Sequence, residues 1–117
     1  MRMLIVEDEM DLREVLAETF RMMGCLVLEA NHGKEALEIL AQEAVDLILT
    51  DVQMPIMDGM TFLKECKAKF RSKIVFVMTG FSHHSKAEFT AQGADGFFEK
   101  PLNITKVYQE GLDKIGI

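Results

Sequence analysis

The sequence predicts an α/β fold, a three-layer α/β/α sandwich in which helices cover both faces of a parallel β-sheet. Short β-rich runs alternate along the chain with longer stretches whose apolar residues recur at helical spacing, which is the pattern of βα units joined by right-handed crossovers. Several of the short runs are apolar at every position, as parallel strands buried on both faces are. We expect residues 1–117 to form a single domain, because 117 residues suit one domain of this kind.

The predicted strands are short runs rich in Val, Ile, Leu and Phe, the residues that suit a buried sheet. In chain order they cover 3–6, 26–28, 47–50, 74–78 and 96–98. Five helices are expected between and after them, each crossing one face of the sheet.

Four of the predicted helices carry an apolar stripe in which residues recur three to four positions apart. The stripes are Leu12, Val15, Leu16, Phe20 and Met23; Ala36, Leu37, Leu40 and Ala44; Phe62, Leu63, Cys66 and Phe70; and Ile104, Val107, Tyr108, Leu112 and Ile115. Gly24 is expected to end the first helix and Asn103 to cap the last. The fourth predicted helix, over 82–92, has few apolar residues, so we expect it to pack least firmly.

The chain has 19 acidic and 13 basic residues and a formal net charge of −6. This balance argues against direct binding to the nucleic-acid backbone, which needs a basic surface, and against electrostatic binding to anionic membranes. No apolar run approaches the roughly 20 residues of a membrane helix, and the apolar start is too short for a secretory signal. We therefore expect a soluble, cytoplasmic protein.

The two cysteines, Cys25 and Cys66, match no zinc-binding spacing. In a reducing cytosol they are expected to be small buried apolar residues rather than a disulfide.

Polar and charged residues come after four of the predicted strands, within two positions of the strand end: Glu7, Asp8, Asp51, Thr79 and Lys100. Because function in an open parallel sheet lies outside the carboxyl ends of the strands, we expect these residues to share one crevice. Three carboxylates repel one another and call for a compensating cation. An all-oxygen site of this kind suits Mg²⁺. Together with a lysine and a hydroxyl, it has the components for phosphoryl transfer onto an aspartate.

Each of these residues also has an ordinary structural explanation. An acidic pair after a strand is common at a helix N-terminus, where the dipole favours it, and a threonine that ends a strand is explained by β-propensity. The functional interpretation therefore depends on the residues occurring together at the ends of separate strands.

The segment from Asp51 to Gly59, DVQMPIMDG, resembles the phosphoacceptor segment of response-regulator receiver domains, the CheY-like family. LIVEDE at 4–9 and FFEKPL at 97–102 resemble two further motifs of that family, and the matches follow in order along the chain. The resemblance implies a five-stranded parallel sheet in the flavodoxin-like order 2-1-3-4-5, with five helices. It also implies a phosphorylatable switch of a two-component phosphorelay, which is not a turnover enzyme on external substrates.

The resemblance implies a role for each site residue. Asp51 is expected to accept a phosphoryl group from a sensor histidine kinase or a phosphotransfer protein, and Lys100 to contact that group. Mg²⁺ is expected to bind Asp8, Asp51 and the backbone carbonyl of Gln53, while Glu7 helps through a metal-bound water.

The resemblance further implies a conformational switch. Thr79 is expected to move toward the phosphoryl group, and Phe97 to rotate inward behind it. The fourth helix, fifth strand and fifth helix would then form the output face, which controls an unknown effector and is a candidate homodimer contact. The peptide between Lys100 and Pro101 is expected to be cis, and Asp58 to cap the helix after the phosphoacceptor loop.

The chain departs from the family pattern at two of these positions: Glu7 replaces an aspartate, and Phe97 replaces a tyrosine. Gln53 and Phe81 occupy positions that tune dephosphorylation in the family, so the sequence does not predict the lifetime of the phosphorylated state.

Three other functions are weighed against this one. A Mg²⁺-dependent hydrolase with an aspartyl-phosphate intermediate would normally carry its nucleophile after the first strand, where this chain has Glu7-Asp8-Glu9. A nucleotide- or flavin-binding module needs a phosphate-cradling loop at the same place, and an acidic loop would repel a phosphate there. A receiver that binds partners without being phosphorylated is the third alternative, and it ranks low because all the site residues are present.

Overall fold

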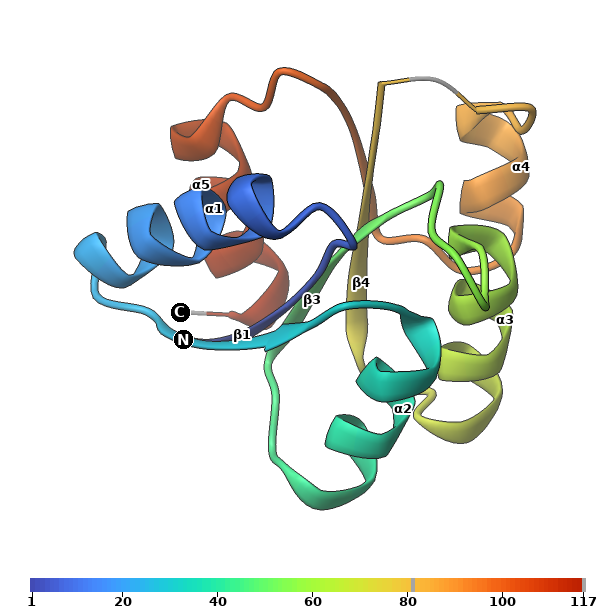
Figure 1. The fold of residues 1–117 in the computed structure, drawn as a ribbon, viewed down its shortest axis with the longest axis horizontal. Helices are drawn as coiled ribbons and strands as arrows, with labels where there is room; N and C mark the ends of the chain where they lie inside the picture. The colour runs from blue at the N-terminus through green and yellow to red at the C-terminus, as the bar shows by residue number, and fades with distance from the viewer. Residues whose placement is uncertain (81, 117) are drawn as a thin grey trace.

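The structure, a computed structural model, describes residues 1–80 and 82–116. Phe81, one of the positions named above, lies outside the described residues. Strands and helices alternate along the described part of the chain, as Figure 1 shows. In chain order they are β1 (Arg2–Val6), α1 (Met10–Met22), β2 (Leu26–Ala30), α2 (Gly33–Gln42), β3 (Leu47–Asp51), α3 (Gly59–Lys69), β4 (Ile74–Thr79), α4 (Lys86–Ala91), β5 (Gly96–Glu99) and α5 (Ile104–Ile115).

The strands form one parallel sheet in the order β2-β1-β3-β4-β5, which confirms the predicted fold class and strand order. The register aligns the carboxyl ends of the central strands, because Val6 pairs with Thr50 and Asp51 pairs with Met78. Residues that follow β1 and β3 therefore emerge at the same edge of the sheet.

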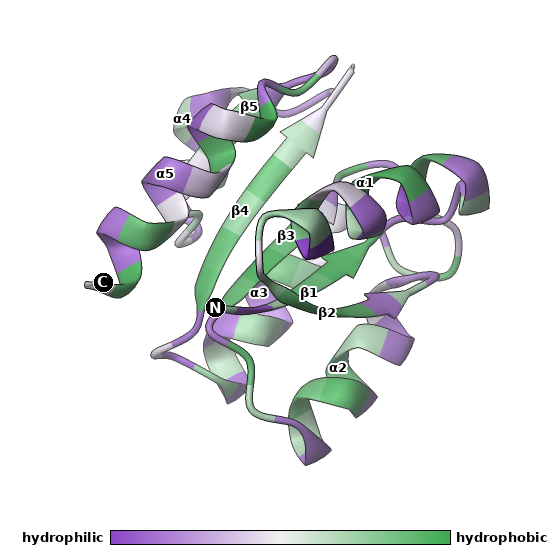
Figure 2. Cartoon of the chain, turned by 90° about the vertical axis from the view of Figure 1, so that its left-hand side faces the viewer, coloured by the Kyte–Doolittle hydropathy of each residue, from purple (hydrophilic) through white to green (hydrophobic). Residues whose placement is uncertain are grey.

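The helices divide between the two faces of the sheet, and each face has its own hydrophobic core (Figures 1 and 2). Helices α1 and α5 cover one face, where Phe20 and Val107 are fully buried against the sheet. Helices α2, α3 and α4 cover the other face, where Phe62 and Phe89 are fully buried. Burial of strands on both faces explains why their sequences are continuously apolar.

Three of the predicted helix ends agree with the backbone. Gly24 has a φ of +94°, in the left-handed region that glycine tolerates just after a helix. The side chains of Asp58 and Asn103 accept hydrogen bonds from the backbone N–H groups of Thr61 (2.8 Å) and Lys106 (3.1 Å), so both act as N-caps. Cys25 and Cys66 are buried free thiols, as expected.

The fourth helix is shorter than predicted. It begins at Lys86 rather than at residue 82, because the hydroxyl of Ser85 accepts the Glu88 N–H at 3.1 Å and caps the helix there. Within residues 86–91, Phe89 is the buried residue. A helix of six residues with one buried anchor has little packing of its own, which agrees with the expectation that it is the least firmly packed.

Val15 was expected in the buried stripe of α1 but is 60% exposed. It faces an open groove between α1 and the segment after β5, which Pro101 and Leu102 also line, rather than the sheet. The apolar stripe of α1 is thus wider than the surface the sheet covers.

Among residues 1–80 and 82–116, no helix has the length and apolar character that a membrane span requires.

Candidate functional site

Three carboxylates meet at the carboxyl edge of the sheet. Glu7 and Asp8 follow β1, and Asp51 is the last residue of β3. One oxygen from each of the three lies within 4.8 Å of the others. Glu7 and Asp51 are buried, at 1% and 6% exposure, whereas Asp8 is exposed to solvent. The structure therefore gathers the acidic residues that the sequence places at separate strand ends.

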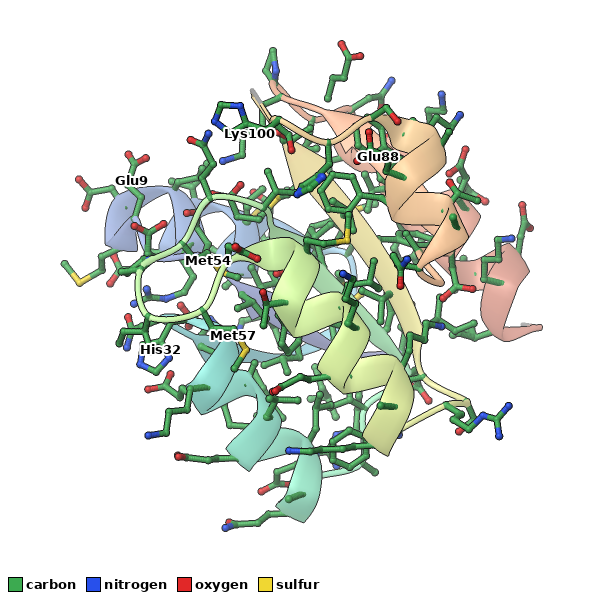
Figure 3. All side chains as sticks on the ribbon, turned by 90° about the vertical axis from the view of Figure 1, so that its right-hand side faces the viewer. Glu9, His32, Met54, Met57, Glu88 and Lys100 are labelled. Carbon is green, nitrogen blue, oxygen red and sulfur yellow. The ribbon has the colours of Figure 1, made fainter. Side chains whose placement is uncertain are left out.

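Lys100, just after β5, reaches into this cluster. Its Nζ donates to Oε1 of Glu7 at 3.0 Å and to Oδ2 of Asp51 at 3.2 Å. The peptide bond between Lys100 and Pro101 is cis, as the family resemblance implies. In Figure 3, Lys100 lies on the same side of the molecule as Glu9 and Met54, which come from two other loops.

Burial and charge in the cluster shift the pKa values of Glu7 and Lys100. Burial, reinforced by the charge of Asp51, raises the pKa of Glu7 from 4.5 to about 7. Partial burial works to lower the pKa of Lys100, but its hydrogen bond to Glu7 and the charge of Asp51 outweigh burial and raise it. Lys100 thus stays positively charged, while burial and the nearby charge of Asp51 oppose the ionisation of Glu7.

Thr79, the last residue of β4, is buried beside this edge of the sheet. Its Oγ1 has no hydrogen-bond partner among residues 1–80 and 82–116. Buried hydroxyls are normally paired. This one is unpaired but covered, so Thr79 would have to turn toward the cleft to bond a ligand oxygen.

The three carboxylates and Lys100 border an open cleft of about 550 Å³, and Thr79 is not among its lining residues. Its lining residues are Glu7, Asp8, Glu9, Asp51, Gln53, Gly80 and Lys100. The donors for a metal are all oxygen, from carboxylates and backbone carbonyls, and this set fits Mg²⁺ rather than a soft transition metal. The three acids have one ammonium between them and can therefore take a further cation. The unpaired Thr79 hydroxyl can take an anionic ligand of that cation.

Phe97 is not among the residues that line this cleft. Its ring is partly buried and lies 5.8 Å from the ring of Phe89 in α4. Phe89 in turn meets the ring of His84 edge-on at 5.8 Å, and His84 bonds Glu88 at 2.8 Å. Phe97 therefore contacts the short fourth helix, on the side of the sheet opposite α1 and α5.

The sequence predictions miss one neighbour of the site, Arg13. It lies in phase with Leu16, Ala17 and Phe20 on the buried face of α1. A charged residue in a buried stripe is unusual, and this is the feature of the sequence that points to Arg13. Its side chain donates to the backbone carbonyl of Glu7 at 2.9 Å.

Comparison with known proteins places this geometry in a family. The model of the response regulator receiver domain matches residues 3–110. A cyclic di-GMP phosphodiesterase of Thermotoga maritima is 37% identical over 105 residues, 89% of this chain and 28% of that protein. Sporulation initiation phosphotransferase F of Bacillus subtilis is 33% identical over 107 residues, 91% of this chain and 86% of that protein.

Among solved structures, the response regulator TrrA of Thermotoga maritima, in complex with Mg²⁺-BeF, is similar with a TM-score of 0.86. It is 27% identical, and the match covers 97% of each chain. The present chain spans about a quarter of the phosphodiesterase but most of the phosphotransferase. The family match covers nearly the whole chain and agrees with its strand order and its acidic edge. The chain therefore belongs to the response regulator receiver domains, the phosphorylatable switches of two-component signal transduction.

Proposed function

We propose that residues 1–117 form one receiver domain and that Asp51 is its phosphoacceptor. A carboxylate oxygen of Asp51 attacks the phosphorus of a phosphohistidine on a sensor histidine kinase or phosphotransfer protein. The P–O bond forms as the P–N bond breaks, and the leaving imidazole takes up a proton. The observation that carries this proposal is the position of Asp51, a buried residue that lines the cleft, 3.2 Å from a lysine ammonium and beside two further acids.

Mg²⁺ would be held by Asp8, Asp51 and the backbone carbonyl of Gln53, with Glu7 acting through a bound water. The ion supplies positive charge and orients the phosphoryl oxygens. The closeness of three carboxylates supports this assignment, because Lys100 alone leaves the cluster with an excess of negative charge.

Lys100 and Thr79 would bind the transferred group. The Lys100 ammonium already lies beside the acceptor carboxylate, so it can donate to a phosphoryl oxygen by giving up one present partner. The Thr79 hydroxyl has no partner to give up within the described part of the chain. Its movement toward the phosphoryl group would open space at the end of β4.

Phe97 would rotate inward into that space, as the family resemblance implies. Its present contact with Phe89 would then change, and with it the surface of α4, β5 and α5. We assign the control of a downstream effector to this face, which is also a candidate homodimer contact. We further propose a cytoplasmic domain that assists its own phosphorylation and dephosphorylation and does not turn over external substrates.

Mass spectrometry after incubation with acetyl phosphate tests the proposal. We expect one phosphoryl group per chain with Mg²⁺ present, little with EDTA, and none in Asp51→Asn. Asp58→Asn is the matched control, because Asn also caps helices and Asp58 lies outside the acidic cluster. Phosphorylation that persists in Asp51→Asn would overturn the assignment, and turnover of phosphomonoesters would point to a hydrolase instead.

A further inference from the structure

Arg13 is nearly buried and makes three hydrogen bonds at the back of the acidic cluster. Its side chain is 11% exposed. Nη1 donates to the backbone carbonyl of Glu7 at 2.9 Å and to Oδ1 of Asn31 at 2.7 Å, and Nε donates to Oε1 of Glu29 at 3.2 Å. One guanidinium therefore ties α1 to the end of β1, to β2 and to the loop after β2.

The bond to the Glu7 carbonyl is the important one. That carbonyl belongs to the peptide group that joins Glu7 to Asp8, so holding it fixes the orientation of the backbone from which the Asp8 side chain leaves. The other side of this segment is fixed by the Glu7 N–H, which donates to the carbonyl of Ala30 at 3.1 Å. Asp8 itself is exposed, so its position depends on the backbone that carries it rather than on burial.

Charge repulsion favours movement of the acidic segment. Glu7, Asp8 and Asp51 repel one another, and the exposed member can relieve that repulsion by turning away into solvent. A rigid, planar guanidinium that binds a carbonyl, an amide oxygen and a carboxylate at once opposes this better than a single-point cation does. Groups that hydrogen-bond to metal ligands without contacting the metal strongly affect metal affinity.

We propose that Arg13 is a positioning residue that holds Asp8 in place for Mg²⁺, an inference that rests on the proposed metal site. It contacts neither the ion nor the phosphoryl group. It acts through the Glu7–Asp8 peptide, so its effect is on Mg²⁺ affinity rather than on the chemistry of the saturated site.

Calorimetric titration with MgCl₂ tests this without any phosphorylation step. Arg13→Met is expected to weaken Mg²⁺ binding about tenfold or more, and Arg13→Lys to fall between it and the unsubstituted protein. Arg21→Met is the matched control, because Arg21 also pairs with Glu29 (3.3 Å) and a backbone carbonyl, that of Val27 (2.9 Å), but does not touch Glu7. It is expected to bind Mg²⁺ within about twofold of the unsubstituted protein, since a distant exposed charge is screened.

A second measurement separates positioning from scaffolding. The rate of phosphorylation by acetyl phosphate in Arg13→Met is expected to recover at saturating Mg²⁺, whereas the Mg²⁺ concentration for half-maximal rate rises about tenfold. A lower melting temperature with unchanged Mg²⁺ affinity would overturn the proposal, and so would equal losses in Arg13→Met and Arg21→Met. If Arg13→Met does not fold, Arg13→Lys decides by the same two criteria. Absence of Mg²⁺ binding in the unsubstituted protein would overturn the proposed function as well. Failure of the Arg13 proposal alone would instead leave Mg²⁺ binding by the unsubstituted protein intact.

Discussion

Nζ of Lys100 lies 3.2 Å from Oδ2 of Asp51, although 49 positions separate the two residues in sequence. The same ammonium lies 3.0 Å from Oε1 of Glu7. One cation thus bridges two buried carboxylates that would otherwise repel each other, and it joins the last strand of the sheet to its centre. An anionic group brought to Asp51 would therefore meet this ammonium.

Replacing Lys100 tests its double role. Lys100→Met is expected to lower the free energy of unfolding of the metal-free protein at pH 8 by about 1–3 kcal/mol, because it leaves two buried carboxylates without their cation. It is also expected to slow phosphorylation of Asp51 roughly a hundredfold. Urea denaturation and timed mass spectrometry measure the two effects. Lys64→Met, on an exposed lysine of α3, is the control; an equal effect there would contradict the prediction.

The raised pKa of Glu7 predicts an unusual dependence of stability on pH. Between the ordinary pKa of 4.5 and the folded-state pKa of about 7, the folded protein holds a proton that the unfolded chain releases. The free energy of unfolding of the metal-free protein should therefore fall as the pH rises through this window, by a total on the order of 3 kcal/mol. The loss is complete about one pH unit above this folded-state pKa.

Glu7→Gln should remove this decline, because glutamine does not titrate. In EDTA the variant is expected to match the unsubstituted protein near pH 4.5 and to be more stable at pH 8, by urea denaturation. Added Mg²⁺ should stabilise the unsubstituted protein more than the variant at pH 8. Glu9→Gln, at an exposed neighbour in the same segment, should keep the decline. A decline that survives in Glu7→Gln would assign it to another group.

Much of the fold follows from local pattern, whereas contacts between distant segments do not. The continuously apolar runs mark β3 and β4 because both are buried on two faces. Strand order is different: alternating βα units allow several orders, so the order 2-1-3-4-5 came from the family resemblance alone.

The residues of the candidate site also differ in how far the sequence predicts them. Asp51 and Lys100 are predictable as strand-end residues, since that position depends only on where each strand stops. The role of Arg13 is not predictable, because its partners Glu29 and Asn31 belong to another βα unit. The sequence does not predict the late start of α4, because the polar segment before it resembles an exposed helical turn until the cap at Ser85 is known.

Two buried threonines predict opposite responses to the same substitution. Thr50 and Thr79 are both buried, but the Thr50 hydroxyl donates to the Asp51 carbonyl at 2.9 Å, whereas that of Thr79 is unpaired among the described residues. Thr79→Val is expected to raise the free energy of unfolding by about 0.5–1 kcal/mol, and Thr50→Val to lower it by about 1 kcal/mol. Urea denaturation of the unphosphorylated proteins distinguishes the two, and a loss in both would contradict an unpaired Thr79 hydroxyl.

The loop after Asp51 carries backbone strain at Ile56. This residue has a φ of +70°, in the left-handed region that β-branched residues avoid, and it is 75% exposed. A hydrogen bond of 2.7 Å from the Met57 N–H to the Pro55 carbonyl closes a tight turn around it. Ile56→Asn is expected to stabilise the protein by about 1 kcal/mol, because asparagine tolerates this conformation and little apolar burial is lost. Ile56→Val should leave stability unchanged, since valine is also β-branched; equal melting temperatures for both variants would show that the turn is not strained.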